Sequence, residues 1–204
     1  MRTNVDQLLD IPPHKSVLIF SQFRSGSTAL ADHISKKLDV TNFDEAFHNC
    51  YPQRNRDFLD HLPKRCVFKV TGDQAGQAPA HVLDRLWNDC YVIKLSRQNL
   101  LDQCTSWVIS ERGNTVWHQK RGQQVNDYTV NIERNWFQLH INQIIRTNRM
   151  HNEFHHPKGF DLELEYEKIT IPKSDYQPRK RPDNYTQVRN SVAEILNNHF
   201  GISV

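Results

Sequence analysis

The chain has 204 residues, of which 37% are hydrophobic and 24% charged, a globular composition that suffices for one domain with its own core. Lys and Arg number 26 against 23 Asp and Glu, a surplus too small for a general nucleic-acid-binding surface, which favours a local anion site. No apolar run approaches the roughly 20 residues of a membrane helix. Asp6, Asp10, Pro12 and Pro13 stand where a signal peptide would be apolar. We therefore expect one cytoplasmic domain over residues 1–204.

The four cysteines are Cys50, Cys66, Cys90 and Cys104, and no two of them form a Cys-x-x-Cys pair. This spacing favours neither a zinc site nor a disulfide framework. We expect reduced, mostly buried thiols.

Short apolar runs alternate with helical patterns along the first 110 residues. Strands are expected over 16–21, 66–71 and 91–95, and helices over 28–38, 80–87 and 100–110. Strands that alternate with helices form parallel sheets with crossover connections. The predicted fold class is therefore α/β, with a central parallel β-sheet flanked by helices in a P-loop-like arrangement.

The second half of the chain has a different pattern. Ile132, Trp136 and Leu139 recur at helical spacing on one long stretch. The alternating apolar residues of 160–166 predict a late strand that returns to the sheet, and 185–196 predict a closing amphipathic helix. We find no internal repeat and no second domain.

The turn after the first expected strand, Phe23-Arg-Ser-Gly-Ser-Thr28, has the composition of an anion-binding loop. Gly26 lets the backbone approach an anion, and free amides at the helix start point at it. Arg24 adds positive charge and a planar set of donors. The expected ligands of the anion are Arg24, Ser25, Gly26, Ser27 and Thr28.

A nucleoside triphosphatase loop is the nearest competitor, and it requires G-x-x-x-x-G-K-[ST]. Ser21 stands at its first Gly and Ser27 at its Lys. Without that Lys the triphosphate loses its cation, so a metal-free phosphate or phosphosulfate is expected instead. A P-loop-like nucleoside or small-molecule kinase and a noncatalytic nucleotide-binding module remain as alternatives.

The turn resembles the loop with which sulfotransferases bind the 5′-phosphosulfate of 3′-phosphoadenosine-5′-phosphosulfate (PAPS). Residues 95–107, followed by Thr115-Val-Trp117, resemble the second signature of the bacterial trehalose-sulfotransferase-like family. The resemblance implies that PAPS is the cosubstrate, that no metal is needed, and that Arg97 and Ser106 hold the 3′-phosphate. The residues alone also allow another interpretation, in which Arg97 forms a surface ion pair and Ser106 faces a neighbouring helix.

Asn42-Phe-Asp-Glu-Ala-Phe47 resembles the segment in which this family has a Gly-Glu pair. The resemblance implies that Glu45 is the general base, with Asp44 in place of Gly adding a like charge. His48 is the reserve base, because other sulfotransferases use a His. Lys69, near the end of a strand, would neutralise charge on the transferring group. A solvated acidic loop and a surface lysine are the alternatives.

Two later segments extend the resemblance. Residues 162–169 are similar to the family's late Tyr-Glu-[DE]-Leu segment, which is mainly architectural. Arg179 and Lys180 lie in a basic loop where some sulfotransferases wrap the 3′-phosphate, although a solvated loop is the simpler interpretation. We therefore expect a sulfotransferase that acts on a hydroxyl of a carbohydrate or small molecule. Neither nucleic acid nor a membrane is expected as a partner, and a homodimer is left open.

Overall fold

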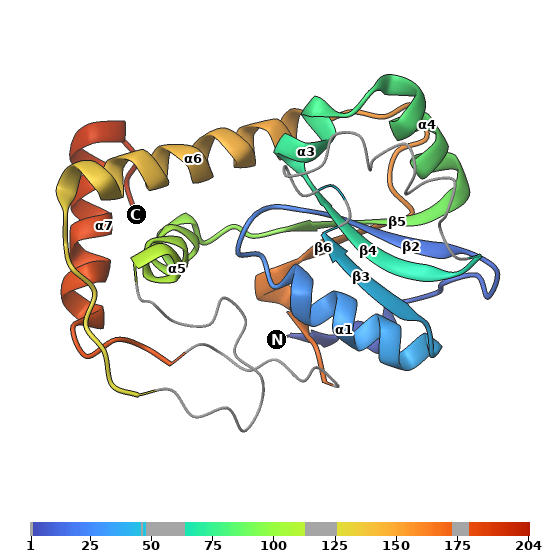
Figure 1. Ribbon diagram of the computed structural model, residues 1–204, viewed down its shortest axis with the longest axis horizontal. Coiled ribbons are helices and arrows are strands. Elements are labelled where there is room, and N and C mark those ends of the chain that lie inside the picture. The colour runs from blue at the N-terminus through green and yellow to red at the C-terminus, as the bar shows by residue number, and fades with distance from the viewer. Residues whose placement is uncertain (1, 46, 48–63, 113–125, 173–179) are drawn as a thin grey trace.

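A computed structural model describes residues 2–45, 47, 64–112, 126–172 and 180–204. These residues form a five-stranded, all-parallel central sheet in the order β3-β4-β2-β5-β6 (Figure 1). The strands are β2 (Ser16–Ser21), β3 (Thr41–Glu45), β4 (Cys66–Thr71), β5 (Cys90–Ser96) and β6 (Leu162–Glu165). The predicted α/β class with a central parallel sheet is confirmed.

Helices cover both faces of the sheet and extend beyond one end of it (Figure 1). They are α1 (Ser27–Leu38), α3 (Gly72–Gln77), α4 (Ala80–Asp89), α5 (Leu100–Arg112), α6 (Arg134–Glu153) and α7 (Tyr185–Phe200). Each helix predicted in the first 110 residues is confirmed to within two residues at either end, while α3 was not predicted. None of the described helices is long and apolar enough to cross a membrane.

The central strands β2 and β4 are buried on both faces, which explains their largely apolar sequence. Every residue of β2 and of β4 is buried. Leu18 and Phe20 pack with α4, whereas Val17 and Ile19 pack with α1 on the opposite face. Because these strands are parallel, the carboxyl ends of β4, β2 and β5 meet at one edge of the sheet, where open α/β sheets bind their ligands.

A third core joins α5, α6 and α7 beyond this edge. The buried stripe of α6 consists of Phe137, Ile141 and Ile144, together with Thr147 and His151 further along. Ile132 and Leu139 were wrong as markers of that stripe. Ile132 precedes the helix, and Leu139 is 65% exposed. Trp136, the other residue of the predicted pattern, packs against this core, so the long helix is confirmed although only part of the predicted apolar pattern faces inward.

Strand β3 replaces the alternative of a solvated acidic loop over the described part of residues 42–45. Thr41 and Asn42 pair with Cys66 and Val67 of β4, after which the register shifts before Glu45. Asp44 lies within this irregularity, with a φ of +53°. An edge strand needs only one apolar face and tolerates polar residues on the other. Its sequence was therefore indistinguishable from a loop.

The described cysteines, Cys66, Cys90 and Cys104, are buried and free, as predicted, while Cys50 lies outside the described residues. Burial raises the pKa of Cys90 and of Cys104 to about 12. Thiols of such high pKa are poor nucleophiles, because the thiolate is the reactive form.

A buried histidine connects α6 with the sheet. The ring of His151 is stacked on Phe20 with centroids 4.6 Å apart and planes at 13°, and the residue is fully buried. Burial lowers the pKa of His151 to about 4, because the charged imidazolium would lose its hydration.

The stability of the protein should therefore depend on pH between about 6.5 and 4. In this window the unfolded His151 binds a proton that the folded one does not, so stability is present above the unfolded pKa and is lost on acidification. We expect this residue to account for about 2 kcal/mol of lost unfolding free energy between pH 7 and pH 5. Urea unfolding of wild type and His151→Gln at both pH values measures it. An equal pH dependence in the two proteins would contradict the assignment.

Candidate functional site

The turn between β2 and α1 has the backbone of an anion-binding loop. Gly26 is the N-cap of α1 with a φ of +82°, and Arg24 also has a positive φ of +54°. The Ser25 hydroxyl donates a hydrogen bond to the carbonyl of Gln22 at 2.7 Å. The proton of Ser25 thus holds the turn together, while the first amides of α1, which have no intrahelical partner, remain for a ligand.

Gly26 is required at its position for two reasons. Its left-handed φ disfavours any residue with a side chain. A Cβ added there would also overlap the ring of Tyr166, which lies in the short helix η2 (Tyr166–Lys168) just after β6. The segment that follows β6 therefore packs directly on the anion-binding turn.

Gly26→Ala should destabilise the protein by about 2–4 kcal/mol, combining the left-handed backbone penalty with overpacking against Tyr166. Gly201→Ala is the matched control, because Gly201 has a φ of +66° with no atom within 4 Å of the added Cβ. Urea unfolding of both variants separates the two contributions. Equal losses in both would mean that Tyr166 moves aside at no cost.

Lys69 connects the turn with the acidic end of β3. Its side chain is only 2% exposed, so the alternative of a surface lysine is wrong. Its ammonium donates to the Thr28 hydroxyl at 2.8 Å, and it lies 2.5 Å from a carboxylate oxygen of Asp44 and 3.6 Å from one of Glu45. A buried cation requires such partners.

Asp44 and Glu45 differ in their distance from the Lys69 ammonium and in their exposure to solvent. Asp44 takes the close contact with Lys69, although it is 53% exposed, whereas Glu45 is 27% exposed and more loosely paired. Glu45 is therefore the carboxylate with less of its charge committed to the ammonium. Because the Thr28 hydroxyl accepts a hydrogen bond from Lys69, its own proton points elsewhere and can be donated to a ligand at the turn.

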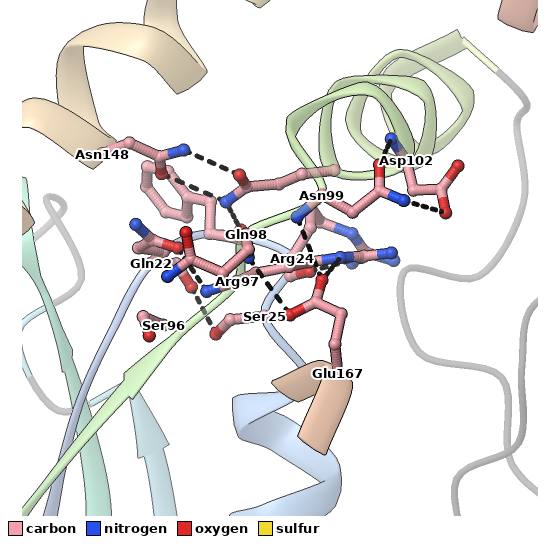
Figure 2. Close-up of polar contacts among 12 residues, drawn as sticks. Gln22, Arg24, Ser25, Ser96, Arg97, Gln98, Asn99, Asp102, Asn148 and Glu167 are labelled. Atoms are coloured by element: carbon pink, nitrogen blue, oxygen red, sulfur yellow. Dashed lines mark hydrogen bonds and ion pairs between the residues drawn. The ribbon is translucent and has the colours of Figure 1, made fainter. Parts of the chain in front are cut away.

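The residues of the second motif also contact the turn, and Figure 2 shows Arg97 beside Arg24. Arg97 follows the end of β5, and its guanidinium donates to the carbonyl of Arg24 at 2.8 Å. Arg24 in turn donates through Nε to the Ser106 hydroxyl at 3.0 Å. Ser106 therefore faces the turn, and the alternative that it faces only a neighbouring helix is wrong.

Arg97 also has an acidic neighbour that sequence reasoning did not single out as a site residue. Its Nε lies 3.6 Å from a carboxylate oxygen of Glu167, so the ion pair of the alternative interpretation exists. The Arg97 side chain is largely buried, however, and the pair is not on the open surface. The resemblance of residues 162–169 to an architectural segment was the only signal that pointed to this position.

The Glu167 carboxylate is bound mainly by backbone amides. Its two oxygens accept hydrogen bonds from the amides of Gln98 and Asn99, each at 3.1 Å. Partial burial by itself raises the pKa of Glu167. The hydrogen bonds from these amides and the charge of Arg97 together outweigh burial, so the pKa of Glu167 lies below its usual value. Glu167 is therefore held as a carboxylate at the start of α5.

A pocket of about 430 Å³ borders Arg97 on the side of α6. Its wall combines the charged side chains of Arg149 and Glu153 with four side-chain amides, those of Gln22, Gln98, Asn148 and Asn152. Gln22 accepts from the Arg97 amide at 2.7 Å and donates to Asn152 at 3.3 Å. Amides both donate and accept, so this wall suits an uncharged polar group next to an anion.

Three predicted site residues remain, and the structure describes one of them, Lys180. His48 and Arg179 lie outside the described residues. The ammonium of Lys180 forms an ion pair with Asp127, and its carbonyl accepts a hydrogen bond from the Tyr128 hydroxyl at 2.8 Å. Lys180 thus packs against the segment that precedes α6, and its role as a donor ligand stays a prediction.

Within the described ranges, no three His, Cys, Asp or Glu side chains gather as a metal site would require. A comparison with models of known protein families found no match, and neither did a search of curated proteins.

Proposed function

We propose that the protein is a sulfotransferase that moves the sulfuryl group of PAPS to an acceptor hydroxyl of a carbohydrate or small molecule. One observation carries the proposal. Three segments distant in sequence meet at the carboxyl edge of the sheet: the turn 23–28, the Lys69 cluster with Glu45, and the Arg97–Ser106 pair. Together they offer an anion cradle, a carboxylate and a second cationic group, which are the parts that this transfer needs.

In the proposed reaction each group has a separate task. The acceptor oxygen attacks sulfur in line while Glu45 takes its proton, and the bond from sulfur to the phosphate oxygen of the donor breaks. Arg24, Thr28 and the α1 amides stabilise the negative charge on the departing adenosine 3′,5′-bisphosphate. Arg97 and Ser106 hold its 3′-phosphate.

The backbone at Asp44 supports the resemblance on which this assignment partly rests. The family has Gly at the corresponding position, and Gly adopts a positive φ without strain. Asp44 has a φ of +53° in this chain, and Asp is one of the few other residues that tolerate it. The substitution therefore keeps the conformation that presents Glu45.

A kinase of the same strand arrangement is the alternative. It would bind ATP with magnesium, but Ser27 stands where its loop needs a Lys, and the nearby Lys69 is engaged by two carboxylates.

Calorimetry with adenosine 3′,5′-bisphosphate, AMP and magnesium-ATP distinguishes a sulfotransferase from a kinase. Assays of transfer from labelled PAPS to carbohydrate and small-alcohol pools follow. Tightest binding of magnesium-ATP would favour the kinase. Bisphosphate binding without transfer to any pool would favour a noncatalytic module.

Arg97→Ala should weaken binding of adenosine 3′,5′-bisphosphate by about 1.5–3 kcal/mol, the usual contribution of a hydrogen bond to a charged group. Binding of AMP should change little, because AMP has no 3′-phosphate. Arg134→Ala is the control, since Arg134 is exposed and pairs with Glu194. Equal losses for both nucleotides, or a large loss of thermal stability, would assign Arg97 a purely structural role.

A further inference from the structure

The side chain of Glu167 crosses from η2 to the start of α5 and ends beside Arg97 (Figure 2). Its two carboxylate oxygens are each used by a separate backbone amide, those of Gln98 and Asn99. These amides directly follow Arg97 in the chain. The carboxylate therefore fixes both the direction in which the chain leaves β5 and the charge next to the Arg97 guanidinium.

The residue itself is anchored from two further sides. Arg2 donates through Nε to the carbonyl of Glu167 at 3.0 Å. The neighbouring ring of Tyr166 covers Gly26 and also lies under the Arg97 guanidinium, 5.0 Å from its centroid. Just beyond η2, the short strand β7 (Ile169–Thr170) pairs with β1 (Thr3–Asn4). A carboxylate attached to so fixed a backbone is poorly suited to swing away when a ligand arrives.

The contacts of Arg97 leave part of its guanidinium for a ligand. Nη1 donates to the carbonyl of Arg24, and Nε faces Glu167 at a distance too long for a hydrogen bond. No described residue accepts a hydrogen bond from Nη2. Glu167 and the Arg24 carbonyl thus hold the guanidinium from one side while its remaining donors stay available.

We propose that Glu167 is a positioning residue, which orients Arg97 and the start of α5 for the 3′-phosphate of the donor. The inference rests on the proposed function, since it requires a 3′-phosphate as the ligand of Arg97. Glu167 does not itself contact the ligand. It acts by holding the arginine and the two amides in the geometry that the phosphate needs.

Glu167→Gln tests this role, because it keeps the size and one hydrogen-bonding oxygen but removes the charge and the second acceptor. Calorimetry should show roughly tenfold weaker binding of adenosine 3′,5′-bisphosphate and nearly unchanged binding of AMP. Glu163→Gln on β6 is the matched control, since Glu163 is 68% exposed and paired with Lys94, and it should bind both nucleotides as wild type does.

A double-mutant cycle with Arg97→Ala separates positioning from general stabilisation. If Glu167 acts through Arg97, then Glu167→Gln should cost clearly less affinity in the Arg97→Ala background than in the wild type, with only the contribution of the two amides remaining. Full additivity, or an equal loss for AMP, would overturn the positioning role. Tighter binding of the bisphosphate by Glu167→Gln would overturn it too, because the carboxylate would then compete with the phosphate.

Glu167→Asp provides a second variant. Its side chain is too short to reach both amides, so it should give an intermediate loss of affinity, and it replaces the Gln variant if that one does not fold.

The wild-type measurement distinguishes failure of the positioning role from failure of the proposed function. If the wild type shows no preference for the bisphosphate over AMP, the proposed function fails, and the role of Glu167 with it. If the wild type prefers the bisphosphate and Glu167→Gln keeps that preference in full, the positioning role alone is overturned.

Discussion

Glu45→Gln should lower turnover roughly 10²–10⁴-fold, the usual contribution of a general base, while leaving the affinity for adenosine 3′,5′-bisphosphate close to that of the wild type. The amide keeps the shape of the side chain but cannot accept the acceptor's proton at neutral pH. Steady-state kinetics with PAPS and an acceptor from the transfer screen give the turnover, and calorimetry gives the affinity. A loss in affinity without a loss in turnover would remove Glu45 from the chemistry.

Asp44→Asn and His48→Ala are the informative comparisons. Asp44 is the carboxylate closer to Lys69, so its replacement should change turnover by less than tenfold if Glu45 is the base. His48 is the reserve base and lies only three positions further along the chain. If His48→Ala abolished turnover and Glu45→Gln did not, the base would be His48. Full activity of both variants would require an acceptor acidic enough to react without a base.

The sequence predicts well those elements whose signal is local. β2, β4 and β5 are largely apolar because they lie inside the sheet with helices on both faces, and such runs stand out from the surrounding pattern. The turn at Gly26 is equally visible, since a small residue with a positive φ is needed where a strand turns into a helix. Both kinds of feature depend on neighbours in the chain and not on the rest of the fold.

Features set by distant contacts are less predictable. Lys69 is a single cation within the otherwise mostly apolar strand β4, and nothing local indicates that its ammonium is buried against Thr28 and Asp44, 41 and 25 positions away. Glu167 is similar, because its partners Gln98 and Asn99 precede it by about 70 residues. The acidic residues near the end of a short polar strand could be interpreted as a loop until β4 was seen beside them.

Lys69→Met should have the largest combined effect on stability and activity. Removing the ammonium leaves the Asp44 and Glu45 carboxylates without their cation and releases the Thr28 hydroxyl from its fixed orientation. Breaking a fully buried ion pair costs about 3–5 kcal/mol, and because both carboxylates are partly exposed we expect about 2 kcal/mol here. Turnover should fall roughly 10²-fold or more, the range for losing one charge-stabilising donor.

A second substitution separates the two effects. In Lys69→Met/Asp44→Asn the uncompensated carboxylate closest to the missing ammonium is gone, so much of the lost unfolding free energy should return. Turnover should not return, because Thr28 still lacks the partner that directs its proton toward the donor. Urea unfolding and steady-state kinetics on the single and double variants provide both readouts. If the double variant recovered turnover together with stability, Lys69 would serve only to neutralise β3. If Lys69→Met were as stable as the wild type, its ammonium could not be the buried counter-ion of Asp44 and Glu45.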